Sequence, residues 1–357
     1  MSEAGDPGTH VDPVDALVAG IGWPHSDAER AVRDQLTGHG LGRLVELGAW
    51  LAGTQAAAPP RAPARPRMIT VSVGPDPDPL TAELADSLGV GIRVVHAPGP
   101  ATDAEAVTAA VDAGAAAVDA EVDAGADLLL LADPNGADEV AVLTAISLIT
   151  SAEPVRVVGT SGGRSDADWM RAVAELRDLR RRVVAVRSQP LALWAGLGSA
   201  PLAVQTGMLL HAAARRTPVV LDGPATAAAA LLAREASARA IRWWAAGHRG
   251  ADIAHALALE RLHLEPVVDL ALDRPSGLGA LLALGPLRAA VAACAAARMP
   301  ETEPETESET EPETEPAPEP EPAPERQLQS EPAPEPVRAA TSADVGLDEG
   351  RPDQTGG

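Results

Sequence analysis

The chain lacks three residue types altogether. Phenylalanine, tyrosine and lysine are absent from its 357 residues, so all 28 basic side chains are arginine. This excludes chemistry that needs a lysine Schiff base, a lysine phosphate ligand or a tyrosine acid. The single cysteine, Cys294, excludes a disulfide framework and a cysteine-based metal site. Apolar residues still make up 46% of the chain, mostly Ala, Val and Leu, which is enough for a large buried core.

Basic side chains are scarce relative to acidic ones. The net charge is −23, and residues 301–357 alone hold 17 acidic against 3 basic side chains. The remainder is mildly acidic without a basic stripe, which argues against a nucleic-acid partner. Residues 1–15 are polar and acidic, unlike a signal peptide, and no apolar run reaches the length of a membrane span. We therefore expect a cytoplasmic protein with no membrane partner.

Apolar strands alternate with helical segments through the middle of the chain. We expect strands at 68–73, 92–96, 127–132, 155–158 and 218–221, with helices at 103–124, 137–149, 166–182, 202–214 and 226–236. This alternation predicts an α/β fold, a doubly wound and mostly parallel Rossmann-like sheet with helices on both faces. Ligands bind such sheets at the carboxyl ends of the strands. The loops that follow Gly74, Ala132, Val158 and Leu221 are therefore the places to look for a site.

The composition also predicts how the chain is divided. We expect a disordered segment 1–13, an N-terminal helical segment and linker 14–67, an α/β core 68–235, a C-terminal helical segment 236–300 and a tail 301–357. The tail repeats Glu, Pro and Thr, so it cannot bury apolar surface and is predicted to be disordered. The two helical segments are expected to form a small helical subdomain.

A few polar residues stand out from this pattern, each with a plainer interpretation. Asp133 and Asp222 each end an expected strand, as ligand-facing carboxylates or merely as turn formers. The glycine-rich loop 159–163 suits a phosphate at a helix start, although such turns are common in α/β folds. His248 and His255 are expected on one helical face, where packing or capping is favoured over a metal site that needs a third ligand.

Several stretches occur in the order and spacing of one known family. They are Leu-Gly-Arg-Leu at 41–44, Ala-Gly-Ala-Asp-Leu-Leu at 124–129, the segment 207–223 ending in Pro-Val-Val-Leu-Asp-Gly, and Leu-Glu-Pro-Val-Val-Asp-Leu at 264–270. Over roughly residues 26–298 the chain resembles the nicotinate-nucleotide:dimethylbenzimidazole phosphoribosyltransferases. The resemblance implies transfer of phosphoribosyl from nicotinate mononucleotide to 5,6-dimethylbenzimidazole, which gives α-ribazole 5′-phosphate for cobalamin. It also implies no metal or other cofactor, and a homodimer.

The resemblance points to site residues and to one major departure. The family's catalytic Glu lies in a Gly-Glu-Gly-Thr-Gly segment before the last helix, and Ser276 stands at that position here. A serine hydroxyl is no general base near neutral pH without an activating partner, and such a base contributes about 10²–10⁴-fold. Asp133 is a candidate substitute carboxylate. The substrate-binding positions that the resemblance implies are Gly74, Asp76, Gly159, Gly162, Gly163, Gly277 and Gly279.

The sequence leaves three hypotheses open. The first is a working phosphoribosyltransferase, which the scaffold favours and the changed loops oppose. The second is a catalytically lapsed member that binds a nucleotide or base without turnover. The third is a partner or regulatory subunit, for example in a heterodimer with an intact paralogue.

Overall fold

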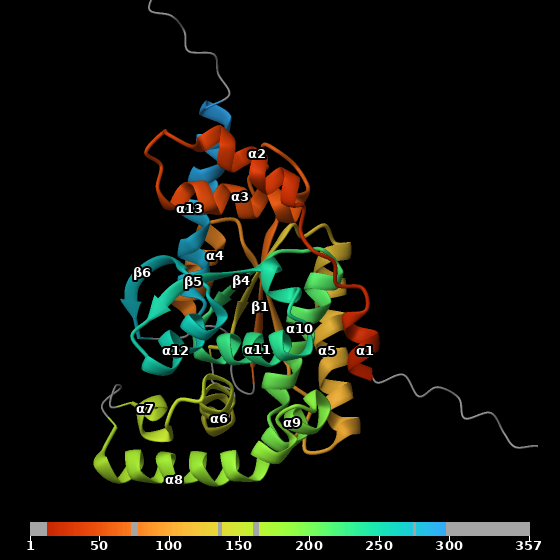
Figure 1. Cartoon of the computed structure of the whole chain (residues 1–357), viewed down its shortest axis with the longest axis vertical. Coiled ribbons are helices and arrows are strands. Elements are labelled where there is room, and N and C mark those ends of the chain that lie inside the picture. Colours follow the sequence, from red (N-terminus) through yellow and green to blue (C-terminus); the bar gives the residue numbers. More distant parts are fainter. Residues whose placement is uncertain (1–12, 73–77, 135–137, 160–163, 274–275, 298–357) are drawn as a thin grey trace, which may run out of the picture. The chain divides into compact units, whose positions relative to one another are not determined.

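Six parallel strands form a single sheet in the order β2-β1-β3-β4-β5-β6 (Figure 1). The strands are β1 (Pro66–Ser72), β2 (Gly91–His96), β3 (Leu128–Ala132), β4 (Val219–Asp222), β5 (Trp244–Gly250) and β6 (Pro266–Leu272). The computed structural model describes residues 13–72, 78–134, 138–159, 164–273 and 276–297. The expected α/β fold with a parallel sheet is confirmed. The strand order reverses between β1 and β3, which is where doubly wound sheets open a crevice at their carboxyl edge.

Helices connect the strands and cover both faces of the sheet (Figure 1). They are α1 (Pro13–Val18), α2 (Ser26–Leu36), α3 (Arg43–Gln55), α4 (Pro79–Ser87), α5 (Ala104–Asp123), α6 (Glu139–Thr150), α7 (Pro154–Val158), α8 (Asp166–Val183), α9 (Pro190–Leu197), α10 (Ala200–Ala214), α11 (Gly223–Ala236), α12 (Ile253–Leu262) and α13 (Leu278–Ala296). Two short 3₁₀ turns, η1 (Val184–Val186) and η2 (Ala240–Trp243), complete the described elements.

Side chains of the central strands point alternately into two hydrophobic cores, one on each face of the sheet. In β3, Leu129 and Leu131 face the core shared with α5, α10 and α11, whereas Leu128 and Leu130 face the core shared with α13 and α3. Successive side chains of a strand point to opposite faces, so a strand buried on both faces is apolar throughout. This is why β3 reads Leu-Leu-Leu-Leu-Ala.

Helices α5 and α10 approach each other closely on the first face. A Cβ atom at Gly207 of α10 would lie 2.5 Å from the carbonyl oxygen of Val111, and one at Gly114 of α5 would overlap the carbonyl of Val204. The absence of side chains at these two positions allows the helix backbones to pack directly.

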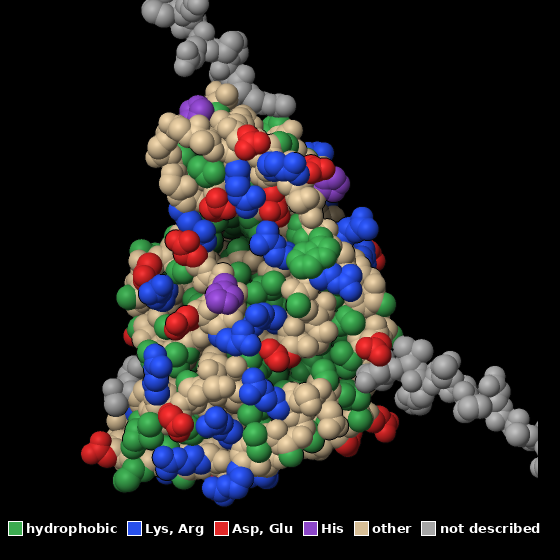
Figure 2. All heavy atoms as spheres, in the orientation of Figure 1, with side chains coloured by type: hydrophobic (Ala, Val, Ile, Leu, Met, Phe, Trp, Pro, Cys, Tyr) green, Lys and Arg blue, Asp and Glu red, His purple; other side chains and the backbone are tan. Residues whose placement is uncertain are grey.

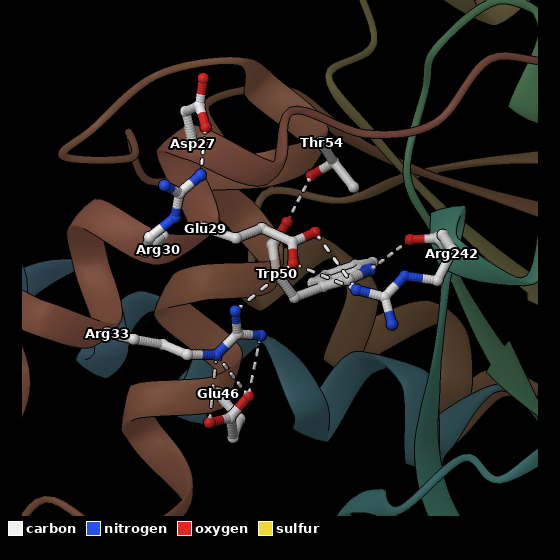
Figure 3. A network of polar contacts seen from close by, with 8 residues as sticks. All are labelled: Asp27, Glu29, Arg30, Arg33, Glu46, Trp50, Thr54 and Arg242. Carbon is white, nitrogen blue, oxygen red and sulfur yellow. Dashed lines mark hydrogen bonds and ion pairs between the residues drawn. The ribbon is translucent and has the colours of Figure 1, made fainter.

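The N-terminal helices and the second half of α13 form the expected small helical cluster. Val32 and Leu36 of α2 pack with Ala49 and Ala52 of α3 and with Cys294 of α13. A polar network then joins this cluster to η2 (Figure 3). The carboxylate of Glu29 in α2 lies 3.1 Å from the guanidinium of Arg242, whose carbonyl accepts a hydrogen bond from the Trp50 indole.

A hollow of about 480 Å³ lies beside this network, and Figure 2 shows it edged by charged side chains. Its glutamates are all held in ion pairs with its arginines: Glu29 with Arg33 and Arg242, Glu46 with Arg33, and Glu265 with Arg43. This hollow lies at the amino end of β5, away from the carboxyl edge of the sheet. We therefore assign it a role in joining the helical cluster to the sheet.

Two sequence expectations were wrong. Residues 155–158 form part of helix α7 and not a strand, because Pro154 starts a helix at its first position and β3 pairs directly with β4, leaving no gap in the sheet. The run Val-Arg-Val-Val is too short for periodicity to separate strand from helix. Residues 236–300 are not wholly helical, since they supply β5 and β6 and so complete the sheet. The division into domains stays a prediction.

Helix α13 has the length and apolar composition of a membrane-spanning helix, and among the described residues it alone does. The sequence prediction of no such run was therefore wrong for this segment. Its apolar side chains are nevertheless used inside the protein, because Leu281, Leu284 and Leu287 are fully buried and the helix packs across β4, β5 and β6. Core burial accounts for its composition.

Candidate active site

A hollow of about 250 Å³ opens at the carboxyl ends of β3, β4, β5 and β6. Val142 and Leu143 of α6 and Pro224 of α11 give it apolar walls, and the strand ends contribute polar groups that include His248. Its volume lies just below the usual range for ligand sites of about 300–1,000 Å³, so it suits one ring system better than a whole nucleotide. This is the edge at which parallel sheets bind ligands.

A buried carboxylate–imidazole pair joins the ends of β4 and β5. Asp222 Oδ1 lies 2.6 Å from His248 Nδ1, and the two side chains are 0% and 2% exposed. They meet because β4 and β5 are parallel neighbours with Leu221 level with Ala246, so Asp222, the last residue of β4, is level with Gly247 and adjacent to His248. The contact has the distance of an ion pair, whereas neither atom has a hydrogen-bond partner of good geometry among the described residues.

The start of α13 holds this pair in place. The Gly277 N–H donates a hydrogen bond to Asp222 Oδ2 at 2.6 Å, from a backbone with φ of +93° that side-chain-bearing residues rarely adopt. A Cβ atom at Gly279 would overlap both His248 Nδ1 and Asp222 Oδ1. Both glycines, predicted to bind substrate, thus pack against the carboxylate–imidazole pair.

Ser276 lies next to this arrangement and is buried, with 4% exposure. Its hydroxyl oxygen has no hydrogen-bond partner among the described residues. A hydroxyl without a neighbouring base stays protonated and cannot act as a general base near neutral pH. No hydrogen-bond partner within the described residues could therefore activate the Ser276 hydroxyl.

A second histidine, His255 at the start of α12, lines the same hollow. Its Nδ1 accepts a hydrogen bond from the Gly250 N–H at 3.1 Å, so Nε2 carries the ring proton when the ring is neutral. Burial, reinforced by His248 and Arg249, lowers the pKa of His255 to about 3. The ring is therefore neutral near pH 7. Its Nε2 is buried and lacks a partner within the described residues, which leaves one N–H to offer a ligand.

Asp133 directly follows β3 and lines the hollow. It is 2% exposed, and its Oδ2 accepts a hydrogen bond from Nε2 of Gln205, a fully buried residue of α10. The amide holds the carboxylate in one orientation. Within the described ranges no three His, Cys, Asp or Glu side chains are grouped to hold a metal ion.

The start of α6 is occupied by the chain's own acidic groups. Asp138 caps the helix by accepting hydrogen bonds from its first N–H groups at 3.1 and 3.4 Å. Glu139 forms an ion pair with Arg164 at 2.5 Å. Asp252, which precedes α12, lines the same hollow. Its burial and the nearby charge of Glu139 raise its pKa, while the Ala254 N–H and Arg164 oppose this effect. The start of α6 is therefore closed to a phosphate by its own cap.

The predicted site residues separate into three groups. Asp133 lines the hollow, and Ser276, Gly277 and Gly279 lie at the start of α13 beside the Asp222–His248 pair. Gly159 ends α7 with φ of +60° and does not line the hollow. The remaining four fall outside the described residues: Gly74, Asp76, Gly162 and Gly163.

Sequence reasoning placed the two histidines wrongly and missed Gln205. His248 lies in strand β5 and His255 in α12, with ring centroids 5.5 Å apart, and not on one helical face. The segment Trp244–Gly250 contains no β-branched residue, so residue propensities did not indicate a strand there. Gln205 lies within an apolar helix and gave no local signal, whereas Asp222 was correctly singled out as a strand-terminal carboxylate.

Comparison with known proteins gives a consistent result. A family model described as phosphoribosyltransferase matches residues 90–303. The nicotinate-nucleotide--dimethylbenzimidazole phosphoribosyltransferase of Mycobacterium marinum (strain ATCC BAA-535 / M) is 37% identical over 318 residues, covering 74% of this chain and 88% of its own. The enzyme of that name from Mycobacterium tuberculosis (strain ATCC 25618 / H37Rv) is 36% identical over 327 residues, covering 77% and 91%.

Solved structures agree with this. A crystal structure of CobT from Thermus thermophilus superimposes with a TM-score of 0.66 at 24% identity, covering 78% of this chain and 96% of that one. A second, of the nicotinate-nucleotide–dimethylbenzimidazole phosphoribosyltransferase from the same organism, has a TM-score of 0.64 at 25% identity, covering 75% and 94%. The chain belongs to the nicotinate-nucleotide:dimethylbenzimidazole phosphoribosyltransferase family.

Proposed function

We propose that this chain moves the phosphoribosyl group of nicotinate mononucleotide onto 5,6-dimethylbenzimidazole, giving α-ribazole 5′-phosphate and nicotinate for cobalamin biosynthesis. The observation that carries the proposal is the lining of the 250 Å³ hollow, where apolar walls meet buried acid and imidazole groups. Such a site suits a flat, uncharged bicyclic base next to a reacting centre that becomes positively charged.

The electrostatics of the hollow support this reaction. The ribose C1′ becomes cationic as nicotinate departs, and preorganised negative groups stabilise developing positive charge. Four carboxylates line the hollow, those of Asp133, Glu139, Asp252 and Asp273, and of these Glu139 is neutralised by Arg164. Nicotinate leaves from a pyridinium and is already an activated leaving group, so its departure needs no metal. Because these carboxylates repel an anion, we expect the phosphate of nicotinate mononucleotide to bind outside the hollow.

Binding without turnover is the second candidate, and Ser276 favours it. The hydroxyl at this position is buried and without a base, so the proton acceptor that the family resemblance implies is missing. A working homodimer, a heterodimer with an intact paralogue and a cytoplasmic location remain predictions.

The test is a transfer assay on the purified full chain. Nicotinate mononucleotide and 5,6-dimethylbenzimidazole are incubated with wild type, with Ser276→Glu and with Ser188→Glu, which adds the same charge at an exposed serine. We expect α-ribazole phosphate from the wild type. Binding of both substrates without product, with turnover gained only in Ser276→Glu, would support the second candidate. Binding of neither substrate by a folded protein would overturn both.

A further inference from the structure

The transfer reaction leaves a proton that needs an acceptor. One ring nitrogen of the benzimidazole bonds to C1′, and the other then carries an acidic N–H on a cationic ring. Ser276 cannot take this proton, and its hydroxyl has no base beside it within the described part of the chain. An acceptor must therefore come from another buried group that faces the hollow.

We infer that His248 is this general base, with Asp222 as its positioning residue; the inference rests on the proposed function. Asp222 Oδ1 lies 2.6 Å from His248 Nδ1, and its other oxygen already accepts the Gly277 N–H at 2.6 Å. The contact has the distance of an ion pair but not the geometry of a hydrogen bond. A lone pair on Nδ1 would face the carboxylate oxygen at this distance and be repelled, so we place the ring proton of the neutral imidazole on Nδ1. The lone pair is then on Nε2.

His248 itself lines the hollow. Gly250 lines it too, and a Cβ atom built at Gly250 would lie 3.5 Å from His248 Nε2. The same Cβ atom would lie 3.0 Å from His255 Nδ1 and 3.4 Å from the Leu272 carbonyl, so glycine at position 250 avoids crowding between the two imidazoles. We expect a benzimidazole bound in the hollow to reach Nε2 of His248, whose Nδ1 on the other side of the ring contacts the buried carboxylate of Asp222.

The two histidines have opposite roles in this arrangement. His255 is neutral and can only donate from Nε2, because its Nδ1 accepts the Gly250 N–H. His248 is backed by the carboxylate of Asp222, which stabilises the imidazolium that forms when it takes a proton. The different contacts of the two Nδ1 atoms thus divide the roles of donor and acceptor between the two rings.

The other charged groups around His248 are Arg249 next to it in β5 and the hollow-lining Asp133, Glu139, Asp252 and Asp273. At the start of α13 the pair is contacted by Gly277 and Gly279, which are uncharged.

The step balances as follows. The lone pair of one benzimidazole nitrogen forms a bond to C1′, while the bond from C1′ to the nicotinate nitrogen breaks and its electron pair returns to the nicotinate ring. Nicotinate leaves with a neutral ring nitrogen and its carboxylate. The remaining N–H proton of the benzimidazole passes to His248 Nε2 and afterwards to water.

A benzimidazole substrate that has no N–H group provides the sharpest test. 1,5,6-Trimethylbenzimidazole can attack C1′ but has no proton to give up, so its transfer needs no general base. We expect His248→Gln to lower kcat with 5,6-dimethylbenzimidazole by about 10²–10⁴-fold and to leave the rate with the trimethyl compound within a few-fold of wild type. We expect the same selective loss in Asp222→Asn, because an amide that donates to Nδ1 forces the ring proton onto Nε2.

The outcomes separate the inference from the function on which it depends. If the wild type makes no product from either base, the proposed function has failed. If the wild type is active and His248→Gln lowers kcat equally with both benzimidazoles, the histidine has a structural role and the inference is overturned. The inference is also overturned if His248→Gln leaves kcat unchanged with both. Should the wild type reject the trimethyl compound, the pH profile of kcat decides. The limb that rises with pH must then disappear in His248→Gln, and its persistence overturns the inference.

Discussion

Arg67 Nε on β1 donates a hydrogen bond of 2.6 Å to Glu121 Oε2 on α5. Glu121 is only 2% exposed, and Arg93 on β2 contacts its other oxygen, so one buried carboxylate ties two strands to a helix. Burial alone would raise the pKa of Glu121, but the hydrogen bonds and charges of the two arginines outweigh it and hold the pKa below its usual value.

Glu121→Gln should lower the free energy of unfolding by about 1.5–3 kcal/mol at pH 7, the range for hydrogen bonds to charged groups. Because the folded pKa is depressed, this stability is present above the unfolded pKa of about 4.3 and is lost as pH falls through the folded value. Urea unfolding at pH 7 and in acid measures both effects. The control is Glu175→Gln, at an exposed side chain. If the free energies of unfolding of wild type and Glu121→Gln differ as much in acid as at pH 7, the stabilisation does not come from the ionised Glu121.

His255 makes a second contribution to the pH dependence of stability. Its pKa falls to about 3 on folding, so below pH 6.5 the unfolded chain binds a proton that the folded chain excludes. The free energy of unfolding should therefore decrease as the pH is lowered from about 6.5 towards 3, by up to about 1.4 kcal/mol per pH unit from this group. His255→Asn keeps an acceptor for the Gly250 N–H but does not titrate, so it should lack this slope. His25→Asn, at an exposed position, should keep it. Identical slopes in wild type and His255→Asn would refute the linkage.

Gly207→Ala should destabilise the fold by about 1–3 kcal/mol, the usual cost of overpacking. Its methyl group would lie 2.5 Å from the carbonyl oxygen of Val111, so α5 and α10 must separate. Gly22→Ala makes the same change where nothing lies within 4 Å of the new atom, and it should change stability by less than about 0.5 kcal/mol. Denaturant titration compares the two, and equal effects would show that the helix contact is unimportant.

Gly279→Ala should lower turnover by about 10²-fold or more, because the new methyl group occupies the space of the Asp222–His248 contact. The measurement is kcat in the transfer assay, with circular dichroism and Tm to show that the fold persists. Gly22→Ala serves again as the matched substitution. Full turnover in a folded Gly279→Ala variant would mean that the pair is not needed for the reaction.

The core of the sheet could be predicted because its strands are buried on both faces. The Leu-Leu-Leu-Leu-Ala run of β3 is an unambiguous signal, and so is the strand β4 that ends in Asp222. β5 could not be found in this way, since Ala, Gly and His have no local preference for a strand. Its place comes from its neighbours β4 and β6 and from α13, against which Gly247 packs.

The site was only partly predictable for a related reason. Asp133 and Asp222 could be identified because a strand-terminal carboxylate in a parallel sheet faces the ligand edge. The partners of these residues are distant in sequence: Gln205 is 72 residues from Asp133, and Gly277 is 55 residues from Asp222. Such pairs depend on strand order and register, and no local pattern specifies them.

The hydrogen bond from Gly277 to Asp222 has a consequence for the chain during its synthesis. Asp222 and His248 can be laid down as neighbouring strands while the C-terminal part is still being made, but the carboxylate is fixed only when α13 begins. Contacts of long sequence separation form late, and vectorial synthesis delays them further. If His248 is the general base, as we infer, a nascent chain should lack an oriented base until the start of α13 has left the ribosome.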